Sequence, residues 1–188
     1  MEVPRNNPES AQTPANTSHA ALFSLSNKTI AITGGGRGLG ITLAAAVLEA
    51  GGNAACIDIL PNPSPDEWVA LKRTAAFAGL NVSYHTCDIT QEIELARVLD
   101  EIAAEGNRLQ MPFYGAIACA GIQQKVPAVE YPSADFERIL RVNVTGTFLT
   151  AKHTARILIE NGVKGSIVMI ASMSGQVANR VCYLVSFE

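Results

Sequence analysis

The sequence lacks any uncharged apolar run that approaches the ~20 residues a transmembrane helix requires. It also lacks an apolar signal-peptide region, and its first 27 residues hold one Arg and two Glu, which argues against a mitochondrial presequence. We therefore expect a cytoplasmic protein. A surplus of positive charge is absent too, because the formal net charge is −3 and no basic stripe runs along the chain. Neither nucleic acid nor a membrane is therefore expected as a partner.

Metal-binding patterns are missing as well. The three histidines lie far apart in the sequence, and the four cysteines show no C-x-x-C spacing. We interpret the cysteines as small buried side chains in a reducing compartment, and we expect no metal site.

The composition that remains is that of a globular protein. Apolar residues make up 48% of the 188 residues and charged residues 16%, which suits one domain with a sizeable core. Residues 1–24 are rich in Pro, Asn, Ser and Thr and show no periodicity. We expect them to form a disordered tail, followed by one domain at residues 25–188.

Short apolar runs alternate with amphipathic segments from Lys28 onward. Strands are expected at 28–33, 53–59, 82–86, 114–119 and 167–171, the last one apolar throughout, as is typical of a parallel strand in the middle of a covered sheet. Helices are expected at 38–50, 65–78, 91–105 and 133–160, with Ser64 and Ser133 as amino-terminal caps. The apolar stripe of the first helix is predicted at Leu39, Leu43, Ala46, Val47 and Ala50. This alternation predicts an α/β fold of the Rossmann type, in which a doubly wound parallel sheet carries helices on both faces.

A glycine-rich segment, T-G-G-G-R-G-L-G, joins the first predicted strand to the first helix. Glycine lets the backbone turn tightly and approach a pyrophosphate closely, and the helix start offers free N–H groups to that anion. A ligand-free turn is the alternative that remains. The residues expected to bind a dinucleotide here are Gly34, Arg37, Gly38, Leu39 and Gly40.

Asp58 ends the second predicted strand and bears on the choice of cofactor. A carboxylate at this position can accept hydrogen bonds from the adenosine ribose and repel the 2′-phosphate of NADP. Arg37 acts in the opposite direction, because its cation could pair with that phosphate. The sequence favours NAD but leaves NADP open, and Asp58 could also be an ordinary polar residue at a strand end.

Further cofactor contacts are expected where the third and fourth strands end. Ligands of doubly wound sheets lie outside the carboxyl ends of the strands. Asp88 and Ile89 follow the third strand, and Ala120 and Gly121 follow the fourth. We expect Asp88 to meet the adenine, although a turn residue at a helix entry would look the same. Gly121 would let the backbone come near the nicotinamide ribose.

Together these motifs resemble the short-chain dehydrogenase/reductase family from about residue 25 to residue 180. The segments R-V-N-V-T-G and A-S-M-S-G are most similar to fungal members that act on mannitol, arabinitol or sorbose. The resemblance implies hydride transfer between NAD or NADP and a small ketose, polyol or similar alcohol. Ala118 and Cys119 stand where many members have two Asn residues, which weakens a structural hydrogen-bonding role at those positions.

The resemblance also implies catalytic roles. Asn143, an amide on an apolar helix face, matches the family's proton-relay Asn and would also border the cofactor. Ser172 matches the Ser that orients the substrate, with Ser174 as a second candidate. Tyr183 matches the general acid/base, but Phe187 occupies the position of the family's Lys, which lowers the pKa of that Tyr. We therefore expect impaired catalysis or none.

A complete family member has about 250 residues, consistent with a single α/β domain. We therefore expect this chain to carry an incomplete domain of five strands, without the last strands of the fold, and to associate through its fifth strand. Complete members form homo-oligomers, whereas the state of this chain stays open. Two functions are left: an oxidoreductase, or a non-catalytic protein that binds a dinucleotide.

Overall fold

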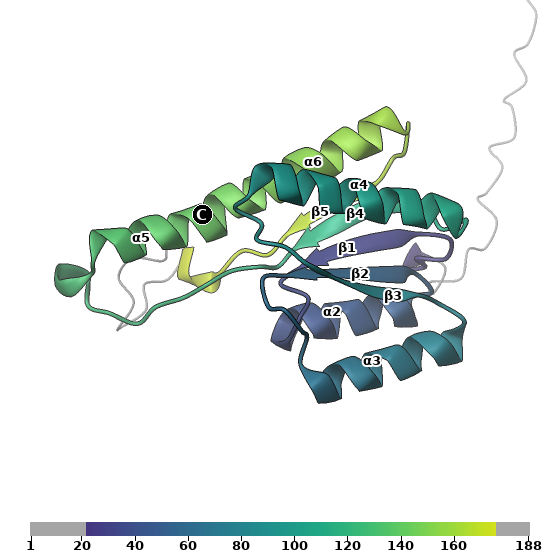
Figure 1. Ribbon diagram of the computed structural model, residues 1–188, viewed down its shortest axis with the longest axis horizontal. Coiled ribbons are helices and arrows are strands. Elements are labelled where there is room, and N and C mark those ends of the chain that lie inside the picture. The colour runs from purple at the N-terminus through teal and green to yellow at the C-terminus, as the bar shows by residue number, and fades with distance from the viewer. Residues whose placement is uncertain (1–21, 176–188) are drawn as a thin grey trace, which may run out of the picture.

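A computed structural model describes residues 22–175 of the chain. Its centre is a five-stranded sheet whose strands are all parallel and follow the order β3-β2-β1-β4-β5 (Figure 1). The strands are β1 (Thr29–Thr33), β2 (Asn53–Asp58), β3 (Val82–Thr86), β4 (Phe113–Ala118) and β5 (Ser166–Met169). The predicted doubly wound parallel sheet of Rossmann type is confirmed, and each strand lies within a few residues of its expected range.

Helices cover both faces of the sheet (Figure 1). One face carries α2 (Gly38–Glu49) and α3 (Pro65–Ala78), and the other carries α4 (Glu92–Arg108) and α6 (Thr147–Glu160). Each layer encloses its own apolar core. Ile32, Ile41 and Leu48 anchor the core beneath α2, and Leu95, Leu99 and Phe113 anchor the core beneath α4.

Helix α2 shows a different buried face from the one that the sequence predicted. Its buried side chains are Ile41, Ala44, Val47 and Leu48, whereas Ala46 is exposed and Leu39 is 55% exposed. The helix is apolar nearly all round, so its sequence did not identify one stripe. Packing of its small and branched residues against β1 and β2 decides the face and leaves Leu39 beside the loop that precedes the helix.

The next two helices follow the prediction more closely. Helix α3 begins at Pro65 and ends at Gly79, whose φ of 67° gives the left-handed ending that favours glycine. Ser64 precedes it as expected but makes no capping hydrogen bond through its side chain. The predicted apolar stripe of α4 is confirmed, because Leu95, Leu99, Ile102 and Ala103 are all buried.

The long helix expected at 133–160 is interrupted. It consists of α5 (Ser133–Leu140), a π-helical segment η2 (Arg141–Gly146) and α6. Ser133 is the first residue of α5, and the cap position belongs to Pro132, so the predicted Ser133 cap is wrong. Single π turns inside α-helices often lie at functional sites, and this one contains Asn143.

The fifth strand is apolar in sequence but is not covered within the described residues. β5 pairs with β4 on one side and lies at the edge of the described sheet. Val168 is 46% exposed and Met169 59% exposed, so its apolar side chains contact solvent. The expected association through this edge stays a prediction. Among residues 22–175, no helix is long and apolar enough to cross a membrane.

Candidate functional site

The chain reverses its strand order between β1 and β4, the point at which doubly wound sheets bind ligands. The loops that leave these two strands touch. A Cβ on Gly34, which follows β1, would lie 2.8 Å from the Cα of Ala120, which follows β4. Gly34 also has a φ of 69°. Glycine is therefore needed at this position for its conformation and for the close approach.

The start of α2 packs equally tightly on the same loop. A Cβ on Gly40 would collide with the carbonyl oxygen of Gly34. This contact brings the first turn of α2 against the loop that ends β1. The unpaired N–H groups and the positive dipole end of the helix are thereby placed at the switch point.

Thr33 fixes the relative position of the two strand ends. Its hydroxyl oxygen accepts the backbone N–H of Cys119 at 3.2 Å and that of Ala120 at 3.3 Å. Thr33 is fully buried, so these bonds are shielded from water. Thr33 begins the glycine-rich motif, but the motif alone indicates no role for its hydroxyl. A hydroxyl side chain at the end of an otherwise apolar buried strand was the available signal.

Asp58 organises the glycine loop from the end of β2. Its Oδ2 accepts the backbone N–H of Gly36 at 2.9 Å, and its Oδ1 accepts that of Leu60 at 3.1 Å. Each oxygen keeps a further lone pair for a ligand. The carboxylate therefore already has a structural role before any ribose is considered.

Tyr84 supports the same loop from β3. Its hydroxyl donates to the carbonyl oxygen of Leu60 at 2.7 Å, and Trp68 packs edge-on against its ring. Burial, and after it the Asp58 carboxylate, raises the pKa of Tyr84 to about 12. The hydroxyl therefore stays protonated and donates throughout the neutral range. No sequence motif indicated this residue.

The loop after β3 forms the next wall. Oδ1 of Asp88 accepts the backbone N–H of Thr90 at 2.9 Å, as in an Asx-turn that leads into α4. Ile89 is buried beneath η2, where a Cβ on Gly146 would lie 2.5 Å from its Cδ1. Burial, followed by the carboxylates of Glu94 and Asp88, raises the pKa of the Cys87 thiol to about 12. This thiol is therefore neutral at physiological pH.

Asn143 finds the partners that an amide on an apolar face requires. Its Nδ2 donates to the carbonyl oxygen of Ile122 at 3.0 Å, and its Oδ1 accepts the N–H of Ile122 at 2.9 Å. The Oδ1 also lies 3.5 Å from the position of a Cβ on Gly121. Asn143 therefore holds the loop after β4 against the helix.

Ser172 lies two residues beyond the last backbone pairing of β5 and is exposed. Its hydroxyl oxygen accepts the backbone N–H of Ser174 at 3.1 Å, and Ser174 itself is buried. Tyr183 and Phe187 lie outside the described residues, as does the predicted tail up to residue 21.

A cleft of about 560 Å³ runs along the carboxyl ends of the strands. It brings together nine of the predicted cofactor residues, namely Gly34, Arg37, Leu39, Gly40, Asp58, Asp88, Ile89, Ala120 and Gly121. Gly38, Asn143 and Ser172 are not part of its wall. The predicted binding residues therefore converge, whereas the two predicted catalytic residues within residues 22–175 stand outside the cleft wall.

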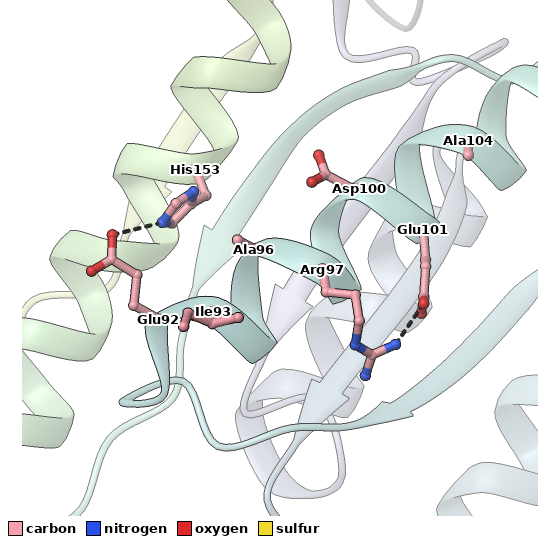
Figure 2. Close-up of a pocket in the computed structure, with 8 residues that line it drawn as sticks. All are labelled: Glu92, Ile93, Ala96, Arg97, Asp100, Glu101, Ala104 and His153. Carbon is pink, nitrogen blue, oxygen red and sulfur yellow. Dashed lines mark hydrogen bonds and ion pairs between the residues drawn. The ribbon is translucent and has the colours of Figure 1, made fainter.

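A larger hollow of about 690 Å³ lies on the outer surface, between α4 and α6 (Figure 2). There Glu92 of α4 reaches His153 of α6, at 3.1 Å from its Nε2, and Arg97 pairs with Glu101 along α4. This hollow is more open and lies along the outer side of α4. Volume alone would favour this hollow as the ligand site. The converging loops and the start of α2 instead favour the cleft at the strand ends as the dinucleotide site.

Comparison with known proteins decides the family. A family model described as short chain dehydrogenase matches residues 28–185, most of the chain. The chain belongs to the short-chain dehydrogenase family. The predicted resemblance is thereby confirmed at the level of the family.

Several members of the short-chain dehydrogenase family are similar in sequence. The chain is 43% identical over 159 residues to the short chain dehydrogenases/reductase notP' of Aspergillus versicolor, covering 85% of this chain and 53% of that protein. It is 39% identical over 158 residues to a 2,5-dichloro-2,5-cyclohexadiene-1,4-diol dehydrogenase of Sphingobium indicum, covering 83% and 58%. It is 32% identical over 170 residues to the D-arabinitol 2-dehydrogenase [ribulose-forming] of Scheffersomyces stipitis, covering 84% and 58%.

A solved structure of the family shows the same fold. The NAD+-bound xylitol dehydrogenase aligns with a TM-score of 0.72 at 26% identity, over 87% of this chain and 59% of that one. The chain thus spans between half and three-fifths of the length of each of these relatives.

The short-chain dehydrogenase cleft also contains residues that the sequence analysis did not single out. Leu60, Thr90 and Gln91 contribute to its wall through the loops after β2 and β3. Arg138 and Arg141 reach it from α5 and η2. Loop residues beside a predicted aspartate could have been included by position. The two arginines could not, because their approach depends on how the long helix crosses the strand ends.

Proposed function

We propose that this chain binds NAD or NADP in the cleft at the strand ends. The close contact between Gly34 and Ala120 at the switch point carries the proposal. Because Gly34 has no side chain, a pyrophosphate can approach the backbone of this loop closely. The start of α2 supplies N–H groups and a positive dipole end for a pyrophosphate. Asp58 and Asp88 each keep acceptor capacity for ribose and adenine groups. The residues present therefore fit a nicotinamide dinucleotide.

We further propose that the whole protein is an oxidoreductase acting on a small polyol, ketose or related alcohol. The bound nicotinamide would supply or accept the hydride. Ser172 would hold the substrate oxygen, and Tyr183 would take or give its proton. Asn143 would act by holding the loop after β4 through Ile122, in addition to the relay role that the family resemblance implies. The D-arabinitol and xylitol dehydrogenases among the relatives support the polyol class.

A second function is favoured by one residue. Phe187 stands four residues after Tyr183, where the family resemblance places a Lys. A Tyr without a nearby cation keeps a pKa of about 10, which is poorly suited to proton transfer at neutral pH. The alternative is therefore a protein that binds the dinucleotide without turning substrate over.

Two measurements test these proposals with the full chain. Fluorescence titration with NADH and NADPH tests binding. Absence of binding to both would refute both functions, because each requires a bound dinucleotide. Single-turnover reactions with NAD or NADP and a panel of polyols, and with the reduced cofactors and ketoses, test catalysis. Binding without turnover, together with turnover in Phe187→Lys, would support the second function for the natural chain.

A further inference from the structure

Arg141 of η2 lines the cleft, and no sequence motif indicates a role for it. Its side chain is exposed, and within residues 22–175 it makes no hydrogen bond or ion pair. Arg138, one turn earlier, also lines the cleft but is paired with Asp135 at 3.4 Å. Arg141 is thus the guanidinium on this wall that is available to a ligand.

The packing of η2 shows near which end of the cleft Arg141 lies. Gly146 of η2 packs against Ile89, so the π-helical segment lies directly over the loop after β3. Arg141 belongs to the same segment, and Asp88 precedes Ile89. Both charged side chains line the same cleft. No ion pair joins Arg141 to Asp88 within residues 22–175, so both charges face the cleft without neutralising each other directly.

We infer that Arg141 binds the adenine ring of the dinucleotide together with Asp88, an inference that rests on the proposed function. The N6 amino group of adenine can donate a hydrogen bond to a carboxylate. Its π face can stack against a planar guanidinium. Asp88 uses Oδ1 for Thr90 and keeps Oδ2 for the amino group. Arg141 is a binding residue for adenine in both NAD and NADP, distinct from any contact with the 2′-phosphate.

Arg141→Gln and Arg141→Lys test this inference by titration with NADH, NADPH, AMP and reduced nicotinamide mononucleotide. Arg141→Gln should weaken NADH, NADPH and AMP by about three- to thirty-fold each, the range of a cation–π contact. Affinity for the mononucleotide, which has no adenine, should not change. Arg141→Lys should recover only part of the loss because an ammonium group lacks the guanidinium plane.

Arg97→Gln on the outer surface of α4 is the matched control, since Arg97 pairs with Glu101 away from the cleft (Figure 2). Unchanged NADH binding in Arg141→Gln, with binding intact in the natural chain, would overturn the inference and leave the proposed function standing. Equal losses for the mononucleotide and AMP, or full recovery with Lys, would also overturn it. A natural chain that binds neither dinucleotide would overturn the proposed function and this inference together.

Discussion

The two sides of the cleft use their polar groups in different ways. On the side formed after β2 and β3, Asp58 accepts the backbone N–H of Gly36, Asp88 accepts that of Thr90, and both carboxylates still line the cleft. On the side formed by β4, η2 and β5, Asn143 uses its amide on Ile122 and stays out of the cleft wall, and Ser172 lies exposed beside the edge strand. On the side expected to bind adenosine, the two carboxylates therefore hold loops and also line the cleft. On the other side, Asn143 and Ser172 are not part of the cleft wall.

The contact between the glycine loop and α2 lies where the two sides of the cleft meet. Breaking it should therefore have the largest effect on cofactor binding. In Gly40→Ala the new Cβ would collide with the carbonyl oxygen of Gly34. We expect the loop to move, at a cost of about 3 kcal/mol in NADH binding, or on the order of 100-fold in Kd. Fluorescence titration and thermal unfolding measure the two consequences.

Gly79→Ala is the control for Gly40→Ala, because Gly79 also carries a positive φ but has open space around it at the end of α3. It should cost about 1 kcal/mol of stability and leave NADH affinity unchanged. If Gly40→Ala bound NADH as tightly as the natural chain, the loop would not be the cofactor site.

The catalytic side can be loosened by itself through Asn143→Ala. Loss of both hydrogen bonds leaves the N–H and the carbonyl of Ile122 without these partners, which should cost about 2 kcal/mol of unfolding free energy. Asn161→Ala removes one hydrogen bond, which the side-chain amide donates to the carbonyl oxygen of Ile157, and should cost about half as much. Chemical denaturation compares the two variants. Equal costs would mean that Asn143 does not hold the loop after β4.

The predicted binding residues line the cleft more often than the predicted catalytic residues do, and this has a physical reason. Glycines and aspartates that directly follow parallel strands lie at the carboxyl edge of the sheet, so the predicted strand ends place them there. The parallel sheet, the helix ends at Gly79 and the stripe of α4 also follow from local patterns. In contrast, the π turn around Asn143, the buried face of α2 and the support of Tyr84 for Leu60 depend on tertiary packing, which no local pattern records.

Selectivity between the two cofactors should depend on the side after β2. Asp58→Ala removes a charge that would oppose the 2′-phosphate, so NADPH affinity should rise about tenfold relative to NADH. The same variant should lose stability, because Gly36 and Leu60 lose the acceptor of their N–H groups. Parallel titrations of both cofactors give the ratio. Asp58→Asn keeps one acceptor without the charge, so it separates repulsion from loop support, and an unchanged ratio in both variants would place the ribose elsewhere.

The smallest effect should come from Arg37, which lies at the same end of the cleft but is exposed to solvent. If its guanidinium pairs with the 2′-phosphate, Arg37→Ala should weaken NADPH by about 1 kcal/mol, or roughly fivefold, and leave NADH unaffected. Screening by salt should reduce this difference, because the pair would be accessible to water. Titrations at low and high ionic strength check both points. Equal losses for the two cofactors would place Arg37 on the pyrophosphate, and the discrimination between NAD and NADP would then rest with Asp58 alone.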